Sequence, residues 1–228
     1  MSDTPAWLQS LVAAADAIPA AEFSAFLPPA EGGRESAVLI LFGEDPTTGP
    51  DLLLIERSSH LRSHAGQPAF PGGAVDPEDD GPEATALREA VEETGLDPSG
   101  VDVLTSLPQL WLPPSGFVVT PVIAWWREPS TVSAVDKTEV ASVVRVPIAE
   151  LANPERRFRV HHPSGWIGPA FGVRDLLVWG FTAGLVDKLL MLGGWEQPWN
   201  HDDVRELPTD VSALALRTLI NRRSDPVL

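Results

Sequence analysis

Residues 82–94 form the helix whose ends are most clearly marked in this sequence. A proline stands at its first position and a glycine directly after its last. Proline is tolerated at the first helical position, and glycine is favoured just past the end. Apolar residues recur at spacings of three and four and predict one stripe that faces a core. They are Leu87, Ala90, Val91 and Thr94. The segment therefore predicts an amphipathic helix packed on another layer.

The other side of this helix carries Glu89, Glu92 and Glu93. At about 100° per residue, the three carboxylates fall within roughly one face of the helix. Like charges at these spacings cost about a few tenths of a kcal/mol on an isolated helix, and a divalent cation would reverse that effect. Mg²⁺ prefers carboxylate oxygens and commonly bridges them to substrate phosphates. The alternative is a solvated acidic surface, which is common for Glu-Glu pairs.

Apolar runs on both sides of the helix predict a sheet, so the expected class is α/β or α+β. The expected strands cover residues 37–42, 51–55, 101–107, 117–126 and 140–146. Helices are expected at residues 4–17 and 175–192, with a last one near 210–223. We expect a peripheral N-terminal helix and linker (1–34), a central domain (35–192) whose part 151–192 is an extension, and a tail (193–228).

The chain is strongly acidic, with a formal net charge of −16 over 228 residues. This charge opposes non-specific attraction to nucleic acid or an anionic membrane. A phosphate-bearing ligand therefore needs a few well-placed arginines or a bound metal. The chain contains no cysteine and no visible secretory signal, so we expect a cytoplasmic protein without disulfides.

Residues 73–96 resemble the Nudix box, G-x5-E-x7-R-E-U-x-E-E-x-G-U, where U is aliphatic. The second half, from Arg88 to Leu96, matches with a small alanine at the first aliphatic position. In the first half, counting from Gly73 makes Asp79 the acid, whereas counting back from Arg88 makes it Asp80. The loop is therefore one residue longer than the pattern, with Asp in place of Glu.

Residues 53–73 are similar to the signature that precedes this box in the coenzyme A pyrophosphatase type of Nudix hydrolase, L-L-T-x-R-(S/A)-x3-R-x3-G-x3-F-P-G-G. Ile55 stands in place of the threonine. The matching positions are Arg57, Ser58, Arg62, Gly66, Phe70, Pro71, Gly72 and Gly73. Weaker similarity continues in residues 115–122 and 179–190. The resemblance covers roughly residues 36–192 and implies a Nudix fold, a mixed sheet between helices with a helical C-terminal extension.

The resemblance implies Mg²⁺- or Mn²⁺-dependent hydrolysis of the pyrophosphate of coenzyme A or an acyl-coenzyme A. Glu89, Glu92, Glu93 and the Gly72 carbonyl would hold the metal, and Arg88 would orient the glutamates. The proton acceptor would be a helix glutamate or Glu139, which is also a candidate for an additional ligand. Substrate contacts are expected from Arg57, Arg62, Ser58, Gly66 and Phe70. We expect no nucleic acid or membrane partner and leave a homodimer open.

Two other functions stay open. One is a Nudix pyrophosphatase for ADP-ribose or an oxidised nucleoside triphosphate, because the box reports the chemistry and not the leaving group. The other is a catalytically silent module that binds nucleotides.

The histidines at 60, 64, 161 and 162 are interpreted as loop or surface residues, since no third zinc ligand is evident. Trp125, Trp126 and Trp179 lie in apolar runs and are interpreted as core residues.

Overall fold

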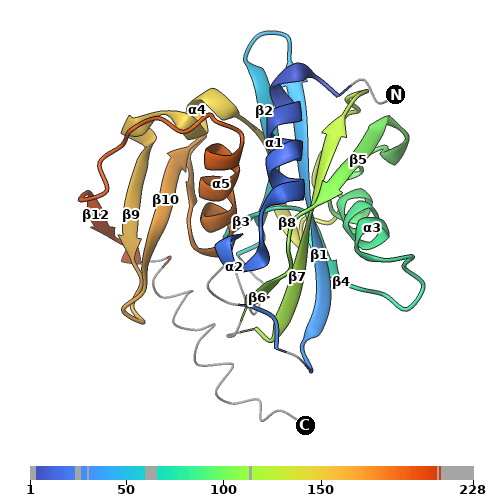
Figure 1. Ribbon diagram of the computed structural model, residues 1–228, viewed down its shortest axis with the longest axis horizontal. Coiled ribbons are helices and arrows are strands. Elements are labelled where there is room, and N and C mark those ends of the chain that lie inside the picture. The colour runs from blue at the N-terminus through green and yellow to red at the C-terminus, as the bar shows by residue number, and fades with distance from the viewer. Residues whose placement is uncertain are drawn as a thin grey trace.

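The computed structural model describes residues 4–23, 27–29, 31–59, 66–112, 115–209 and 211. Within these ranges the strands form two sheets, and helices cover both faces of the larger one (Figure 1). The chain therefore has the mixed α/β architecture expected from its alternating patterns. None of the described helices is long and apolar enough to cross a membrane.

The larger sheet is built around β1, whose apolar run is buried on both sides. The strand order is β3-β2-β1-β7-β5, and β4, β6 and β8 pair with β1, β7 and β2. The strands are β1 (Arg34–Asp45), β2 (Gly49–Arg57), β3 (Pro68–Ala69), β4 (Gly72–Ala74), β5 (Val101–Ser106), β6 (Leu110–Leu112), β7 (Phe117–Trp126) and β8 (Val140–Pro147). β1 and β7 run parallel, with Arg34 opposite Phe117. The other pairs among these described strands are antiparallel.

One face of this sheet is covered by α3 (Pro82–Thr94), whose bounds agree with the sequence prediction. Ala86 and Ala90 are fully buried against β1 and β7 in one apolar cluster, and their small side chains let the helix approach the sheet closely. Leu87 and Val91, expected to face the core, are only partly buried. The helix is turned so that Glu93 lies inside, where it meets Gly72 and Gly73, here called the glycine loop.

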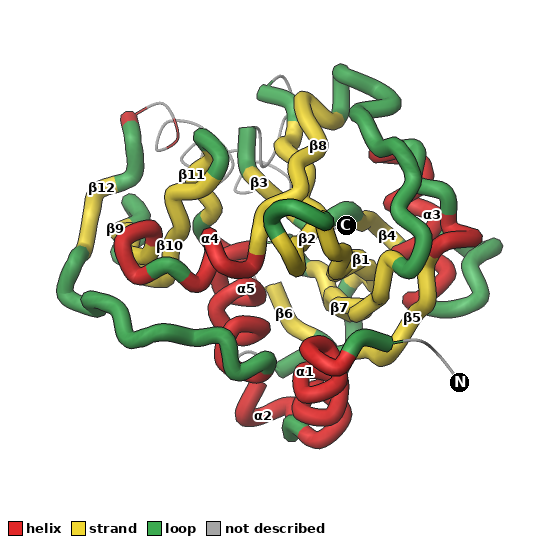
Figure 2. Tube along the Cα trace, turned by 90° about the horizontal axis from the view of Figure 1, so that it is seen from above, coloured by secondary structure: helices red, strands yellow, loops and turns green. Residues whose placement is uncertain are grey.

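The opposite face is covered by α1 (Ala6–Ala17) and α5 (Gly180–Leu192), as Figure 2 shows. Leu8 and Leu11 of α1 are fully buried in the same apolar cluster as α5. The Trp7 ring lies 5.7 Å from that of Trp125 and 6.0 Å from that of Trp195. The N-terminal helix is therefore part of the core, and the expectation of a peripheral segment is wrong.

The extension forms a second sheet beside the first, which the sequence patterns did not predict. Its order is β11-β10-β9-β12, and β12 comes from the tail and runs parallel to β9. The strands are β9 (Arg157–His161), β10 (Ile167–Val173), β11 (Leu176–Val178) and β12 (Val204–Glu206). The short elements are α2 (Ala20–Phe23), η1 (Pro98–Gly100), α4 (Ile148–Ala152) and η2 (Pro154–Arg156).

The helix expected over 175–192 begins only at Gly180. Arg174 and Asp175 have φ of 49° and 61°, and they form a two-residue turn in which Val173 pairs with Leu176. Positive φ at both central residues is the geometry of a tight hairpin turn. Leu176–Val178 are therefore strand (β11), not helix. The last helix expected near 210–223 lies almost wholly outside the described residues.

Candidate active site

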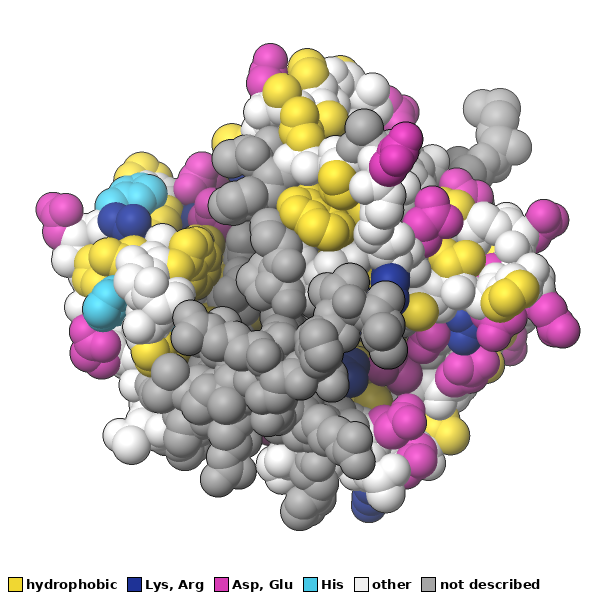
Figure 3. All heavy atoms as spheres, turned by 90° about the horizontal axis from the view of Figure 1, so that it is seen from below, with side chains coloured by type: hydrophobic (Ala, Val, Ile, Leu, Met, Phe, Trp, Pro, Cys, Tyr) yellow, Lys and Arg dark blue, Asp and Glu magenta, His cyan; other side chains and the backbone are white. Residues whose placement is uncertain are grey.

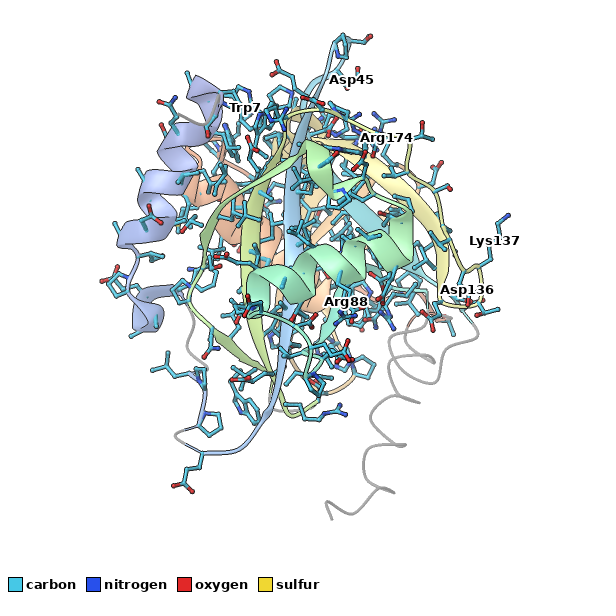
Figure 4. All side chains as sticks on the ribbon, turned by 90° about the vertical axis from the view of Figure 1, so that its right-hand side faces the viewer. Trp7, Asp45, Arg88, Asp136, Lys137 and Arg174 are labelled. Carbon is cyan, nitrogen blue, oxygen red and sulfur yellow. The ribbon has the colours of Figure 1, made fainter. Side chains whose placement is uncertain are left out.

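Arg88, labelled on α3 in Figure 4, is the centre of a polar network that joins this helix to the loop before it. Its Nε and Nη2 donate to the two Asp79 oxygens at 2.9 Å each, and its Nη1 donates to Glu89 at 3.0 Å and to Glu92 at 3.2 Å. Nη2 also donates to the Ala74 carbonyl at 3.1 Å. All five N–H donors of the guanidinium can thus be used. Arg88 fixes two glutamates and ties α3 to the loop before it.

Asp79, not Asp80, is the acid that faces Arg88. Its Oδ2 also accepts hydrogen bonds from the Thr85 hydroxyl at 2.8 Å and from the Asp76 amide at 2.9 Å. The hydrogen bonds from Arg88 hold the pKa of Asp79 well below its usual range. Asp80 is exposed. Counting from Gly73 therefore identified the acid that contacts Arg88, whereas counting back from Arg88 did not. No sequence pattern indicated the role of Thr85.

The glycine loop lies so close to its neighbours that side chains are excluded. A Cβ on Gly72 would lie 2.3 Å from the Ala37 carbonyl of β1, and one on Gly73 would lie 2.3 Å from Glu89 Oε1. The Gly72 amide donates to Glu93 Oε2 at 3.0 Å. Glycine permits such close backbone approach. The loop therefore holds the Glu93 carboxylate directly.

Glu93 is a buried carboxylate among other charges, with 8% of its surface exposed. Burial raises its pKa to about 7, and the charges of Glu89 and Glu139 act in the same direction. The hydrogen bond from Gly72 and the charge of Arg57 lower the pKa. A carboxylate with these properties can exchange a proton near neutral pH, and a nearby cation would favour its ionised form.

Arg57, at the end of β2, brings a positive charge to this carboxylate. Its Nη1 lies 3.8 Å from Glu93 Oε1, and its side chain is 30% exposed. Ser58 is buried, and its amide donates to the Glu139 carbonyl at 2.8 Å. The loop that leads to Glu139 is also bonded to α3, because the Val135 amide donates to the Glu93 carbonyl at 3.2 Å. Arg57, Glu93 and Glu139 are therefore brought together from three separate segments.

The glutamates of α3 divide into two groups. Glu92 is 58% exposed beside Arg88, whereas Glu89 and Glu93 face the glycine loop. In the described residues, no three Asp, Glu, His or Cys side chains are already arranged to hold a metal ion. The donor chemistry of Glu89 and Glu93 nevertheless fits a hard cation, since burial raises the pKa of both carboxyls and a cation would offset that cost.

The other predicted residues have different placements. Phe70 is 3% exposed in the apolar core, so its environment assigns it to packing and not to substrate contact. The Gly66 amide donates to the Arg57 carbonyl at 3.0 Å. Arg62, His60 and His64 lie outside the described residues. Seen from below, acidic side chains crowd the side of the molecule on which α3 lies (Figure 3).

Comparisons with known proteins identify the family of the chain. The family model of the NUDIX domain matches residues 33–164. An uncharacterized Nudix hydrolase, NudL, of Escherichia coli O7:K1 is 38% identical over 168 residues, covering 69% of this chain and 82% of the relative. NudL of Cronobacter sakazakii is 39% identical over 171 residues, with 72% and 85% covered. The crystal structure of RenU, a Nudix hydrolase from M. Smegmatis, superposes with a TM-score of 0.52 at 22% identity, covering 75% of this chain and 92% of that one.

Proposed function

Because the chain belongs to the Nudix family, whose hydrolases cleave pyrophosphate bonds in nucleoside diphosphate derivatives, we propose that its substrate is coenzyme A or an acyl-coenzyme A. The products would be 3′,5′-ADP and 4′-phosphopantetheine or its acyl derivative. The family relationship supports the hydrolysis itself. The choice of substrate rests on the signature in residues 53–73, which includes Arg57 and the glycine loop.

The observation that carries this choice is the position of Arg57. Its guanidinium lies 3.8 Å from Glu93 and is 30% exposed, so it borders the carboxylates and can be reached. Its planar fork matches two phosphate oxygens. In a chain with a net charge of −16, such a local cation is what a polyanionic substrate requires. Arg57 and Gly72 of the signature thus lie beside the helix that carries the candidate metal ligands.

We propose that Glu89 and Glu93 hold a divalent metal ion, with Glu92 and the Gly72 carbonyl as further candidate ligands. Mg²⁺ or Mn²⁺, when bound, would lower the pKa of a water molecule and offset charge on the phosphoryl oxygens. The Asp79–Arg88 pair would keep Glu89 oriented, as outer partners commonly do for metal ligands. Arg57 would bind a phosphate of the substrate.

The proton of the attacking water needs an acceptor. A helix glutamate such as Glu93 is one candidate, because its carboxylate lies at the glycine loop and a bound cation would keep it ionised and able to accept a proton. Glu139 is the other, because it comes from a separate loop and lies close enough to raise the pKa of Glu93. Replacing each by Gln and comparing pH–rate profiles would distinguish the two.

The proposed function is tested by incubating the protein with Mg²⁺ and a panel of coenzyme A, an acyl-coenzyme A, ADP-ribose, NADH and nucleoside triphosphates. Products are identified by mass. We expect 3′,5′-ADP and 4′-phosphopantetheine as the fastest-formed pair. Faster turnover of ADP-ribose or a triphosphate would refute the substrate assignment, and no turnover of any compound would favour the silent nucleotide-binding module.

The role of Arg57 is tested by substitution. Arg57→Ala should raise the KM for coenzyme A by about tenfold or more, and Arg57→Lys should restore only part of the loss, because lysine lacks the bidentate fork. Arg127→Ala is the matched control, since Arg127 is paired with Asp102 and Glu128 on the outer surface. Equal KM values for the wild type and Arg57→Ala would remove Arg57 from the site.

A further inference from the structure

A buried hydroxyl joins the C-terminal extension to the strand beside the candidate site. Thr182 lies in the first turn of α5 and is 6% exposed. Its Oγ1 donates to the Pro68 carbonyl in β3 at 2.9 Å, across 114 positions of sequence. A buried carbonyl that loses its partner costs about 1–3 kcal/mol, so this bond favours one placement of β3 relative to α5.

Residues 66–72 form a strip that runs from Arg57 to Glu93. At its first end the Arg57 amide donates to the Gln67 carbonyl at 3.0 Å. At its other end the Gly72 amide donates to Glu93. Between them, the Leu39 amide donates to the Pro71 carbonyl at 2.8 Å and fixes the strip to β1.

Thr182 contacts this strip close to its first end. Pro68 directly follows Gln67, whose carbonyl accepts from Arg57, and pairs with Glu56 of β2. The bond from Leu39 to Pro71 lies between Pro68 and Gly72, so a displacement that begins at Pro68 should reach Arg57 before it reaches Glu93. The extension is thereby linked to the proposed phosphate contact more directly than to the metal ligands.

We propose that Thr182 is a positioning residue for Arg57, acting through the Pro68 carbonyl, and that it sets how tightly the enzyme binds the substrate pyrophosphate. The inference rests on the proposed phosphate-binding role of Arg57. It gives the extension a part in recognition although Thr182 itself contacts no reacting atom. Loss of the hydroxyl should weaken substrate binding and leave the metal-dependent step unchanged.

The test compares Thr182→Val, which keeps the shape of the side chain and removes the hydroxyl, with Thr182→Ser, which keeps the hydroxyl. Thr105→Val is the matched control, because Thr105 Oγ1 joins β5 to Asp16 of α1 at 2.5 Å on the same side of the sheet. We expect Thr182→Val to raise the KM for coenzyme A by about tenfold, equivalent to 1.4 kcal/mol, with kcat and the Mg²⁺ concentration for half-maximal rate unchanged. Thr182→Ser should restore the KM, and Thr105→Val should not alter it.

Amide hydrogen exchange of the five non-proline residues in 66–72, measured without substrate, gives a readout that does not depend on the choice of coenzyme A. Exchange in this strip should be faster in Thr182→Val than in the wild type, Thr182→Ser or Thr105→Val. If the wild type hydrolyses another compound of the panel, the kinetic comparison uses that compound, and only the substrate assignment has failed. Equal exchange in all four proteins, an unchanged KM in Thr182→Val, or no restoration by Ser would overturn the positioning role.

Discussion

The two faces of the larger sheet are closed by helices of opposite character. α3 meets the sheet through the small side chains of Ala86 and Ala90, and its remaining surface holds the charges that surround Arg88. α1 and α5 meet the other face through buried leucines and a group of aromatic rings around Trp7. The difference indicates that the α1 and α5 face contributes the larger apolar cluster, while the α3 face includes a buried carboxylate that costs stability.

The cost is visible in Glu93. Burying a carboxylate is unfavourable unless it is well paired, and Glu93 has one amide hydrogen bond and an arginine 3.8 Å away. A purely structural helix would gain by placing an apolar side chain there. Substitutions on the two faces should therefore have different effects. Those on the α1 and α5 face should lower stability, and those on the α3 face should lower activity.

The largest expected effect is on the apolar face. Leu11→Ala should lower the free energy of unfolding by about 3 kcal/mol, because a fully buried leucine is replaced by a cavity. Urea denaturation measures this change, with Leu27→Ala as the control, since Leu27 is 48% exposed. The kcat of the folded Leu11→Ala protein should match that of the wild type. A large loss of kcat in the folded variant would contradict the expectation that this face affects stability and not activity.

On the α3 face, Glu93→Gln should lower kcat by at least about a hundredfold, since a charged ligand at the reacting centre contributes a few kcal/mol to transition-state stabilisation. Its circular dichroism spectrum should match that of the wild type. Its melting temperature at neutral pH should not be lower than that of the wild type. Glu83→Gln is the control, because Glu83 lies exposed in the first turn of the same helix. Near-normal turnover in folded Glu93→Gln would place the chemistry elsewhere.

The buried carboxylate also predicts how the metal-free protein responds to pH. The pKa of Glu93 is raised from 4.5 to about 7 on folding, so the unfolded chain releases this proton first as the pH rises. Its contribution to stability is complete below pH 4.5 and is lost as the pH passes through about 7. Between pH 5 and 7, in chelator, the wild type should lose roughly 2 kcal/mol of unfolding free energy relative to Glu93→Gln. Parallel stability curves for the two proteins would contradict the raised pKa.

The smallest effect concerns Asp79, which acts on the site through Arg88. Asp79→Asn weakens the bidentate pair and lets Arg88 move from Glu89, so kcat/KM should fall by about tenfold. Asp80→Asn should have no effect, because Asp80 is exposed. A greater loss from Asp80→Asn than from Asp79→Asn would show that the first half of the box is aligned the other way.

Local patterns in the sequence predicted much of the larger sheet and the helix that carries the candidate metal ligands. Pro82 and Gly95 mark the ends of α3, and the apolar run of β7 has the expected bounds. The strands of the extension were missed because β9 and β10 are short and lie among prolines and glycines, which weaken their alternation. The burial of α1 was missed because its aromatic partners, Phe42, Trp125 and Trp195, are remote in sequence.

The candidate site could likewise be predicted from local patterns only in part. The spacing of Glu89 and Glu93 along one helix was readable from the sequence. That Glu92 is exposed while Glu93 is buried depends on how α3 is turned against the sheet. The closeness of Arg57 to Glu93 depends on how β2 and the glycine loop are placed against α3. The bond from Thr182 to Pro68 requires the extension to be folded in place, and no local pattern reports it.

The parallel pairing of β1 with β7 has a consequence for how the protein folds. Arg34 lies opposite Phe117, and the glycine loop and α3 both belong to the long stretch of chain between these two strands. Pairs so distant in sequence form slowly, because the entropy of closing a long loop is lost before the contacts are gained. The hairpin of β1 and β2 can form early, since its strands are joined by a short turn. We therefore expect catalytic competence to appear during refolding only in the slow phase in which β7 joins β1.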